Sequence, residues 1–137
     1  MTVIDASGAT IGRLGSLVAK RLLSGEEIFI INAEQAIVSG TKDAVVAVYR
    51  QKREVGGTKR KGPFVSRMPH LILKRTIRGM LPYQHPNGRK AYKHLKVYIG
   101  IPETLKNIEA EHIEMRRPSH YITLKDLSSY LGIPWQK

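Results

Sequence analysis

Three glycines near the start of the chain have a spacing that suggests phosphate chemistry. Gly8, Gly12 and Gly15 follow an apolar segment and open a helical pattern. Glu34 lies roughly 20 residues further on, as in the dinucleotide-binding fingerprint. The pattern is incomplete, because position 10 is Thr and Arg13, not Lys, follows Gly12. A nucleotide-dependent enzyme is therefore the second interpretation. The first is that these glycines form a turn and let a helix lie close to a sheet.

The histidines form no recognisable catalytic or metal-binding pattern. None pairs with another at metal-ligand spacing, the chain has no cysteine, and no G-x-S-x-G nucleophile motif occurs. Packed or solvated side chains are the simpler interpretation for His70, His85, His94, His112 and His120. We therefore predict that the protein is not an enzyme and has no metal, other cofactor or small-molecule substrate.

Lysine and arginine are concentrated in one third of the chain. The formal net charge is +12, and residues 50–96 hold 14 of the 23 Lys and Arg residues but one of the 11 acids. A merely solubilising surface mixes its signs, so this segregation indicates a polyanionic partner. Arginine binds phosphate through two hydrogen bonds and stacks on bases. Four aromatic residues among these cations favour a folded, irregular RNA: Tyr49, Phe64, Tyr83 and Tyr92.

A membrane fits this charge distribution less well than RNA does. An anionic membrane surface would require a basic amphipathic helix or a lipidation signal, and neither is evident. No stretch approaches the roughly 20 apolar residues of a membrane span. The lack of cysteine and of a signal-peptide pattern predicts an intracellular protein. The alternative that the cations form a solvated basic face without a specific partner is not excluded by the sequence.

Hydrophobic periodicity predicts alternating strands and helices. The expected strands are residues 2–6, 28–31, 36–38 and 95–99. The expected helices run from a cap at Thr10 to Gly25, over 41–53, over 70–80, and from a cap at Thr123 to Gly132. Glycine and proline predict a basic loop at 54–69 and a turn at 82–93, with one helical turn at 91–94. This order predicts an α/β sandwich with a small, mostly parallel, four-stranded sheet.

The helix expected at 70–80 has two different faces. Leu73, Ile77 and Met80 fall on one side at helical spacing and are expected in the core. The cations at positions 74, 75 and 78 fall on the opposite side. This helix is therefore the element best suited to present positive charge on a rigid support.

Several sequence blocks resemble one protein family. Residues 74–82, KRTIRGMLP, are the most distinctive block, and it is followed by Gly88-Arg89 and by LKVYIGIP at 95–102. Upstream, Asp5-Ala6, the GRL at 12–14, the INAE at 31–34 and Ser39-Gly40 occur in the expected order. Together they resemble the ribosomal protein L13 family of the large subunit over residues 2–102. The GIPE at 100–103 is similar to the archaeal and eukaryotic form, and the short length to the archaeal one.

The resemblance implies a three-layer α/β/α domain that binds large-subunit rRNA and supports subunit assembly and translation. It implies a cytoplasmic location on the ribosome, neighbouring ribosomal proteins as partners, and a helix at 41–53. A scaffold at 1–53 and 94–102, a basic RNA-binding segment at 50–96 and a helical extension at 103–137 are expected within one domain. The C-terminal part is expected to cover the scaffold or to meet a neighbouring protein. A basic regulatory protein that binds RNA off the ribosome is the third interpretation.

The candidate RNA-binding residues are the cations of the basic segment and two cations on the first two helices. They are Arg13, Lys42, Arg50, Lys52, Arg53, Lys59, Arg60, Lys61, Arg67, Lys74, Arg75, Arg78, Arg89, Lys90, Lys93 and Lys96. Gln84 and Asn87 stand in a stretch that is often more basic in the family.

Overall fold

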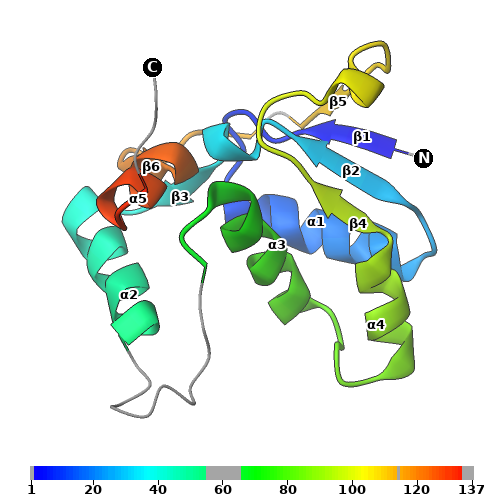
Figure 1. The fold of residues 1–137 in the computed structure, drawn as a ribbon, viewed down its shortest axis with the longest axis horizontal. Helices are drawn as coiled ribbons and strands as arrows, with labels where there is room; N and C mark the ends of the chain where they lie inside the picture. The colour runs from blue at the N-terminus through cyan, green and yellow to red at the C-terminus, as the bar shows by residue number, and fades with distance from the viewer. Residues whose placement is uncertain (1, 55–65, 114, 134–137) are drawn as a thin grey trace.

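The computed structural model describes residues 2–54, 66–113 and 115–133, without the side chains of Arg53 and Glu54. Its elements follow one another along the chain as Figure 1 shows. The strands are β1 (Thr2–Asp5), β2 (Ile28–Ile31), β3 (Ile37–Ser39), β4 (Leu95–Val97), β5 (Glu111–His112) and β6 (Tyr121–Thr123). The α-helices are α1 (Ile11–Leu23), α2 (Lys42–Glu54), α3 (Pro69–Met80), α4 (Pro86–Lys93) and α5 (Leu124–Tyr130). Two short 3-10 helices are η1 (Ala33–Gln35) and η2 (Glu103–Leu105).

The main sheet has four parallel strands in the order β4-β2-β1-β5. In β2, Ile28 and Ile30 belong to the larger core cluster, whereas Ile31 belongs to the smaller one. Successive side chains of a strand point to opposite faces, so both faces of β2 are covered. This explains the continuous apolar run at 28–31. The α/β class and the small parallel sheet predicted from the sequence are confirmed.

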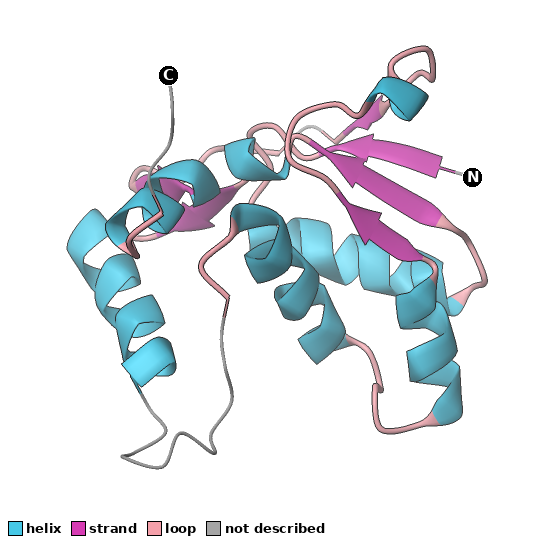
Figure 2. Cartoon of the chain, in the orientation of Figure 1, coloured by secondary structure: helices cyan, strands magenta, loops and turns pink. Residues whose placement is uncertain are grey.

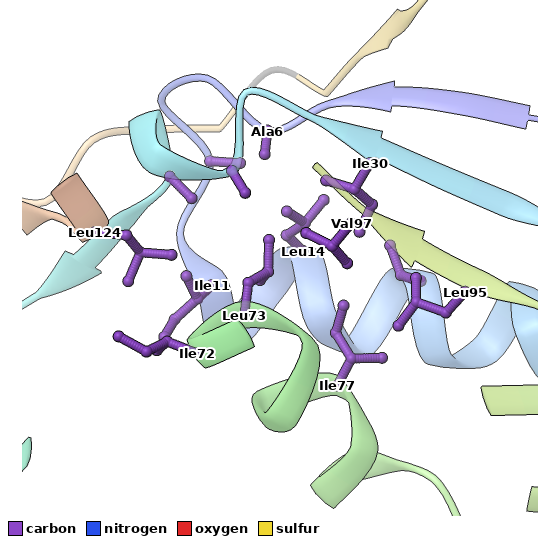
Figure 3. Packing of buried hydrophobic residues seen from close by; sticks show 14 of the residues in the cluster. Ala6, Ile11, Leu14, Ile30, Ile72, Leu73, Ile77, Leu95, Val97 and Leu124 are labelled. Carbon is purple, nitrogen blue, oxygen red and sulfur yellow. The ribbon is translucent and has the colours of Figure 1, made fainter. Parts of the chain in front are cut away.

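One face of this sheet is covered by α1, α3 and α4 (Figure 2). Leu14 of α1 and Leu73 and Ile77 of α3 meet Ile30 and Leu95 of the sheet (Figure 3). These five side chains are almost completely buried. Burying a Leu or Ile side chain contributes about 1.5–3 kcal/mol, so this layer is the main source of stability.

The opposite face is covered by η2 and the chain that follows it. Leu105 packs with Val3 and Ile31 in the smaller core cluster. The rings of Phe29 and Tyr98 stack nearby, with centroids 6.5 Å apart and planes 3° from parallel. The sandwich therefore has an α-helical layer on one side and a shorter cover on the other.

Two strands differ from the sequence-based expectation. The strand expected at 36–38 is present as β3, but it pairs antiparallel with β6 in a separate two-stranded sheet. The fourth strand of the main sheet is β5, which was not predicted. β5 has two residues, both exposed and polar, so it lacks the apolar pattern on which strand prediction depends.

The expected helices at 41–53, at 70–80 and after Thr123 are confirmed as α2, α3 and α5. The predicted cap of α5 is also confirmed, because the backbone N–H of Asp126 donates to Thr123 Oγ1 at 3.2 Å. The expected cap of α1 is wrong in its chemistry. Thr10 occupies the N-cap position, but its hydroxyl lies 3.6 Å from Met115 Sδ and makes no capping bond.

The prediction of a turn over 82–93 is right at residues 82–85 and wrong at 86–90, and the helical turn expected at 91–94 is the end of a longer helix. Residues 86–93 form α4, because Pro86 begins a helix instead of ending one. Proline suits the first helical turn, where its missing N–H is not needed and its φ is already helical. Gly88 lies where α4 meets the preceding turn, and a Cβ there would overlap the carbonyl oxygen of Pro82.

The three glycines at and before the first helix act only partly as the sequence suggested. Gly8 makes the expected turn, with φ at +73°. Gly15 faces α3 instead of the sheet, since a Cβ there would lie 3.0 Å from Met80 Sδ and 3.6 Å from Ile77 Cγ1. Gly12 is exposed, with open space at its Cβ position. Gly15 therefore sets the close approach of α1 and α3.

We predict that Gly88→Ala destabilises the protein by about 1–3 kcal/mol or more, because the methyl group must displace backbone. Gly12→Ala is the matched control, since it also changes a helical glycine but meets no neighbour. It should be neutral or stabilising by up to about 1 kcal/mol. Urea unfolding followed by circular dichroism measures both. Equal stability of the two variants would contradict the packing of α4 on Pro82.

Candidate nucleic-acid interface

Helix α3 has the two faces expected from its sequence. Ile72, Leu73 and Ile77 are buried in the core, whereas Arg75 is exposed and Lys74 is half-buried. The cations therefore stand on a helix whose other side is fixed by packing. The division into a scaffold and a basic segment stays a prediction, and α3 takes part in both.

Met80 differs from the expectation that it belongs to the core. Its side chain is 41% exposed. Its Sδ nevertheless lies against Gly15, where α1 and α3 approach each other. The wrong prediction came from helical spacing alone, because Met80 is at the last turn, where the helix leaves the covered region.

Two tyrosines join the cations of α3 to those of α4. The rings of Tyr83 and Tyr92 meet edge to face, with centroids 5.4 Å apart. Lys74 Nζ lies 5.1 Å from the centroid of Tyr92, and Arg78 Cζ lies 4.7 Å from that of Tyr83. Arg89 Cζ lies 5.9 Å from the same Tyr83 ring. We call these five residues the α3–α4 cluster.

The α3–α4 cluster is held by the backbone as well as by its rings. Arg89 Nε donates to the carbonyl oxygen of Tyr83 at 3.1 Å. The backbone N–H of His85 donates to the carbonyl oxygen of Pro82 at 2.9 Å and closes the turn before α4. A cation above an aromatic face gains about 0.5–1 kcal/mol at an exposed site. These contacts restrict the arginines to a few conformations.

The charges of the α3–α4 cluster are not neutralised by nearby acids. None of its cations forms an ion pair with a carboxylate in the described ranges. Burial lowers the pKa of Lys74, and the positive charge of Lys96 lowers that pKa further. Burial and the charge of Lys74 lower the pKa of His70 in the same way. Burial is the larger cause of both shifts, and the smaller cause is a neighbouring positive charge that a bound anion would offset.

Further candidate cations surround the cluster. Arg75 on α3, Lys90 and Lys93 on α4 and Lys96 on β4 are exposed. β4 lies next to both helices, so seven of the predicted residues belong to one region of the molecule. They are Lys74, Arg75, Arg78, Arg89, Lys90, Lys93 and Lys96. We call this region the α3–α4–β4 surface.

A second group of candidates lies around α2, on the other side of the molecule from α4 (Figure 1). Lys42 Nζ lies 4.1 Å from the centroid of the Tyr130 ring, and a hydrogen bond with Tyr130 raises the pKa of this lysine. Arg50 donates to the carbonyl oxygen of Tyr130 at 3.2 Å. Lys52 Nζ lies 4.8 Å from the ring of Tyr49.

The remaining candidates are scattered. Arg67 donates to the carbonyl oxygen of Leu131 at 3.5 Å, next to the end of α5. The side chain of Arg53 and the whole of Lys59, Arg60 and Lys61 lie outside the described residues. The structure thus places seven of the sixteen predicted residues on three adjoining elements, α3, α4 and β4, and a smaller group near α2.

Arg13 stands apart from both groups and has neighbours that were not predicted from the sequence. It lines a groove of about 860 Å³ together with Arg116 and Arg117. The acidic residues of the C-terminal part suggested that this part does not touch RNA, so its adjacent arginines were not among the expected contacts. The two adjacent arginines in the sequence were the one feature that could have indicated an RNA contact in this part of the chain.

The turn after β1, the candidate nucleotide site, is occupied by structural hydrogen bonds. The Asp5 carboxylate accepts from the N–H of Ser7 at 2.9 Å and from Asn32 Nδ2 at 3.2 Å. Burial works to raise the pKa of Asp5, but the hydrogen bonds from Ser7 and Asn32 outweigh it and lower that pKa. Glu34, the acid of the fingerprint, accepts from the N–H of Gly100 at 2.9 Å. Both carboxylates therefore hold the fold together at this edge of the sheet.

Metal binding and membrane insertion find no support in the described ranges. No three His, Asp or Glu side chains there are grouped so as to hold a metal ion. No helix in the same ranges is long and apolar enough to cross a bilayer.

We predict that Lys96→Gln raises the pKa of Lys74, because it removes a like charge that disfavours the ammonium form. The recovery should be partial, since burial is the larger cause and is unchanged. NMR of the lysine Cε–Hε groups during a pH titration measures this. Lys93→Gln, which removes an exposed charge from α4, is the control. A Lys74 pKa that does not respond to Lys96→Gln would contradict the coupling.

Comparison with known proteins identifies the family. The family model described as ribosomal protein L13 matches residues 1–104. The large ribosomal subunit protein uL13 of Archaeoglobus fulgidus is 47% identical and covers 96% of this chain and 87% of its own. Those of Methanocaldococcus jannaschii and Methanosarcina barkeri are 49% and 51% identical, over 96% of this chain and 98% of theirs. Family model, sequence blocks and relatives agree: the chain belongs to the ribosomal protein L13 family of the large ribosomal subunit, in its archaeal form.

Proposed function

We propose that the protein binds folded large-subunit rRNA through the α3–α4–β4 surface and so supports subunit assembly and translation. The observation that carries this proposal is the α3–α4 cluster, whose cations lie on aromatic rings and have no carboxylate partner in the described ranges. A surface built in this way attracts an external anion. The family supplies the context, because its relatives are proteins of the large subunit and not enzymes. This confirms the expectation that the chain is not an enzyme.

The ring contacts favour binding to a structured partner. A free Arg or Lys side chain loses about 2 kcal/mol of rotamer entropy when it is fixed. Arg78 and Arg89 are already restricted by Tyr83, so less of this entropy remains to be lost on binding. Arginine donates two parallel hydrogen bonds to a phosphate.

The partners and location follow from the same proposal. The α2 group and the loop at 54–69 would contact further rRNA, and the C-terminal part would meet neighbouring proteins of the large subunit. The protein would act in the cytoplasm, as part of the ribosome. Family membership supports this interpretation over the nucleotide-dependent enzyme and over the regulatory protein that binds RNA off the ribosome.

We predict that Arg75→Glu with Arg78→Glu weakens binding to deproteinised large-subunit rRNA at least tenfold. Each lost phosphate contact makes the slope of log K against log [salt] shallower by about 0.7–0.9. Lys20→Glu with Lys106→Glu is the matched control, since it changes the net charge equally at exposed positions outside the surface. Filter binding over a salt series measures both. Equal losses in the two variants would reduce the effect to net charge and overturn the assignment of α3.

We predict that Tyr83→Leu weakens the same binding by about two- to fivefold while leaving the salt slope unchanged, because it removes ring contacts and no charge. Tyr83→Phe keeps the ring and should bind as the wild type does. A shallower salt slope in Tyr83→Leu would mean that a phosphate contact is lost together with the ring. The ring would then place a cation against a phosphate and not merely restrict its conformations.

Sedimentation of a cell lysate tests the ribosomal context directly. The protein should migrate with large subunits in a sucrose gradient and remain with them after a high-salt wash. Recovery of all the protein in the free fractions would refute the proposal and favour an RNA partner off the ribosome.

A further inference from the structure

The groove that contains Arg13 has the chemistry of a second RNA contact. We propose that Arg13, Arg116 and Arg117 bind the phosphate backbone of the same rRNA at a surface separate from the α3–α4–β4 surface. This inference rests on the proposed function and adds two residues that neither the basic segment nor the family match at 1–104 includes. We call these three residues with the groove they line the Arg116 groove.

The Arg116 groove is wide, and the charged residues that line it are all positive. It has a volume of about 860 Å³ and is bordered by residues 10–13, 38–39 and 116–119. None of the described residues that line it is acidic. All three arginines are exposed, and none forms an ion pair with a carboxylate of the described ranges. Arg13 and Arg116 border the groove, and Arg117 lies between it and a neighbouring pocket that Gly8, Tyr121 and Glu34 line. Arginines grouped in this way suit a chain of phosphates better than a single carboxylate.

The chain that carries the two new arginines is anchored on both sides. Before them, the sulfur of Met115 lies 3.6 Å from Thr10 Oγ1 at the start of α1. After them, the N–H of Gly40 donates to the carbonyl oxygen of His120 at 2.9 Å. The pairing of β3 with β6 then continues at Tyr121. The backbone of this segment is therefore held against β3 and α1.

Arg117 is also positioned through its side chain. Its Nη2 lies over Gly8, 3.4 Å from where a Cβ would stand, and its Cζ lies 5.9 Å from the centroid of the Tyr121 ring. Gly8 has φ at +73° and no side chain, so the guanidinium group rests on the backbone of the first turn. As in the α3–α4 cluster, an aromatic ring and not an acid accompanies the cation.

The Arg116 groove and Lys90 of α4 lie at opposite ends of α1, whereas α3 packs on α1 near Gly15. Residues 10–13 line the groove, whereas the other end of α1, at residues 22–25, borders a pocket with Lys90 and His94. A helix of 13 residues is roughly 20 Å long. The groove and Lys90 are therefore too far apart for one phosphate group, and together they would hold two separate stretches of rRNA backbone.

The test uses the full-length Arg116→Gln/Arg117→Gln variant and deproteinised large-subunit rRNA of an archaeal relative. We expect binding to weaken about tenfold or more at about 0.1 M salt, and the salt slope to become shallower by about 1.4–1.8. Hydroxyl-radical footprinting should show that one set of backbone protections is lost. A different set, the one that Arg75→Glu/Arg78→Glu removes, should remain. Lys20→Gln/Lys106→Gln is the control for net charge.

The outcomes separate this inference from the proposed function. If the wild type does not bind the rRNA, the proposed function fails. If the wild type binds and the double variant gives the same affinity, slope and footprint, the Arg116 groove does not contact RNA. Loss of the same protections in both sets of variants would refute a separate surface. If rRNA binding is normal but a cross-link to a neighbouring protein disappears from assembled subunits, the groove binds an acidic protein segment instead.

A fold control is needed because Arg117 packs on Gly8. Thermal unfolding of the double variant should match that of the wild type within a few degrees. If it does not, Arg116→Gln alone is the second variant. It should still make the salt slope shallower by about 0.7–0.9 and weaken the same protections. An unchanged slope in a folded Arg116→Gln variant would overturn the role of Arg116.

Discussion

The packing of α3 on α1 is the interaction on which the rest of the structure depends. Gly15 lets Ile77 and Met80 approach α1 closely, and Leu73 and Ile77 then reach the sheet through the same interface. This contact fixes the rotation of α3 about its axis, so the helix has only one side left for its cations. A larger residue at position 15 would turn or push α3 and would move its charges with it.

Whereas Arg21, which is not among the candidates, is held by Glu26 and Glu111, several candidate RNA-binding cations are positioned by rings and backbone. Tyr83 and Tyr92 do this between α3 and α4, Tyr130 does it beside α2, and Tyr121 does it near Arg117. An acid would fix an arginine equally well, but it would also cancel the charge that attracts a phosphate. An aromatic face orients the cation and leaves its hydrogen-bond donors free. Cations packed on aromatic rings at separate places explain how a strongly basic chain keeps an ordered surface.

Periodicity in the sequence predicted most of the fold. The strands at β1, β2 and β4 and the helices α1, α3 and α5 have clear patterns, and the two faces of α3 could be read from spacing alone. The segment of α2 was ambiguous, because its valines favour a strand while its length and polar flanks favour a helix. Helix α4 was missed because a proline more often breaks a helical pattern than begins one, and β5 because two polar residues carry no apolar pattern. The ring contacts could not be predicted, since they depend on how α4 folds back on α3. The Arg116 groove could not be predicted either, because it joins residues about 100 positions apart in the sequence.

The repulsion between Lys74 and Lys96 has a consequence for the protein before it reaches its partner. The free chain keeps like charges close together, and this self-repulsion lowers the stability of its folded state. A ligand that binds only the folded form stabilises it, and a polyanion would also remove the repulsion. Under the proposed function, a copy that stays unassembled would lack this stabilisation and would unfold more easily than an assembled one.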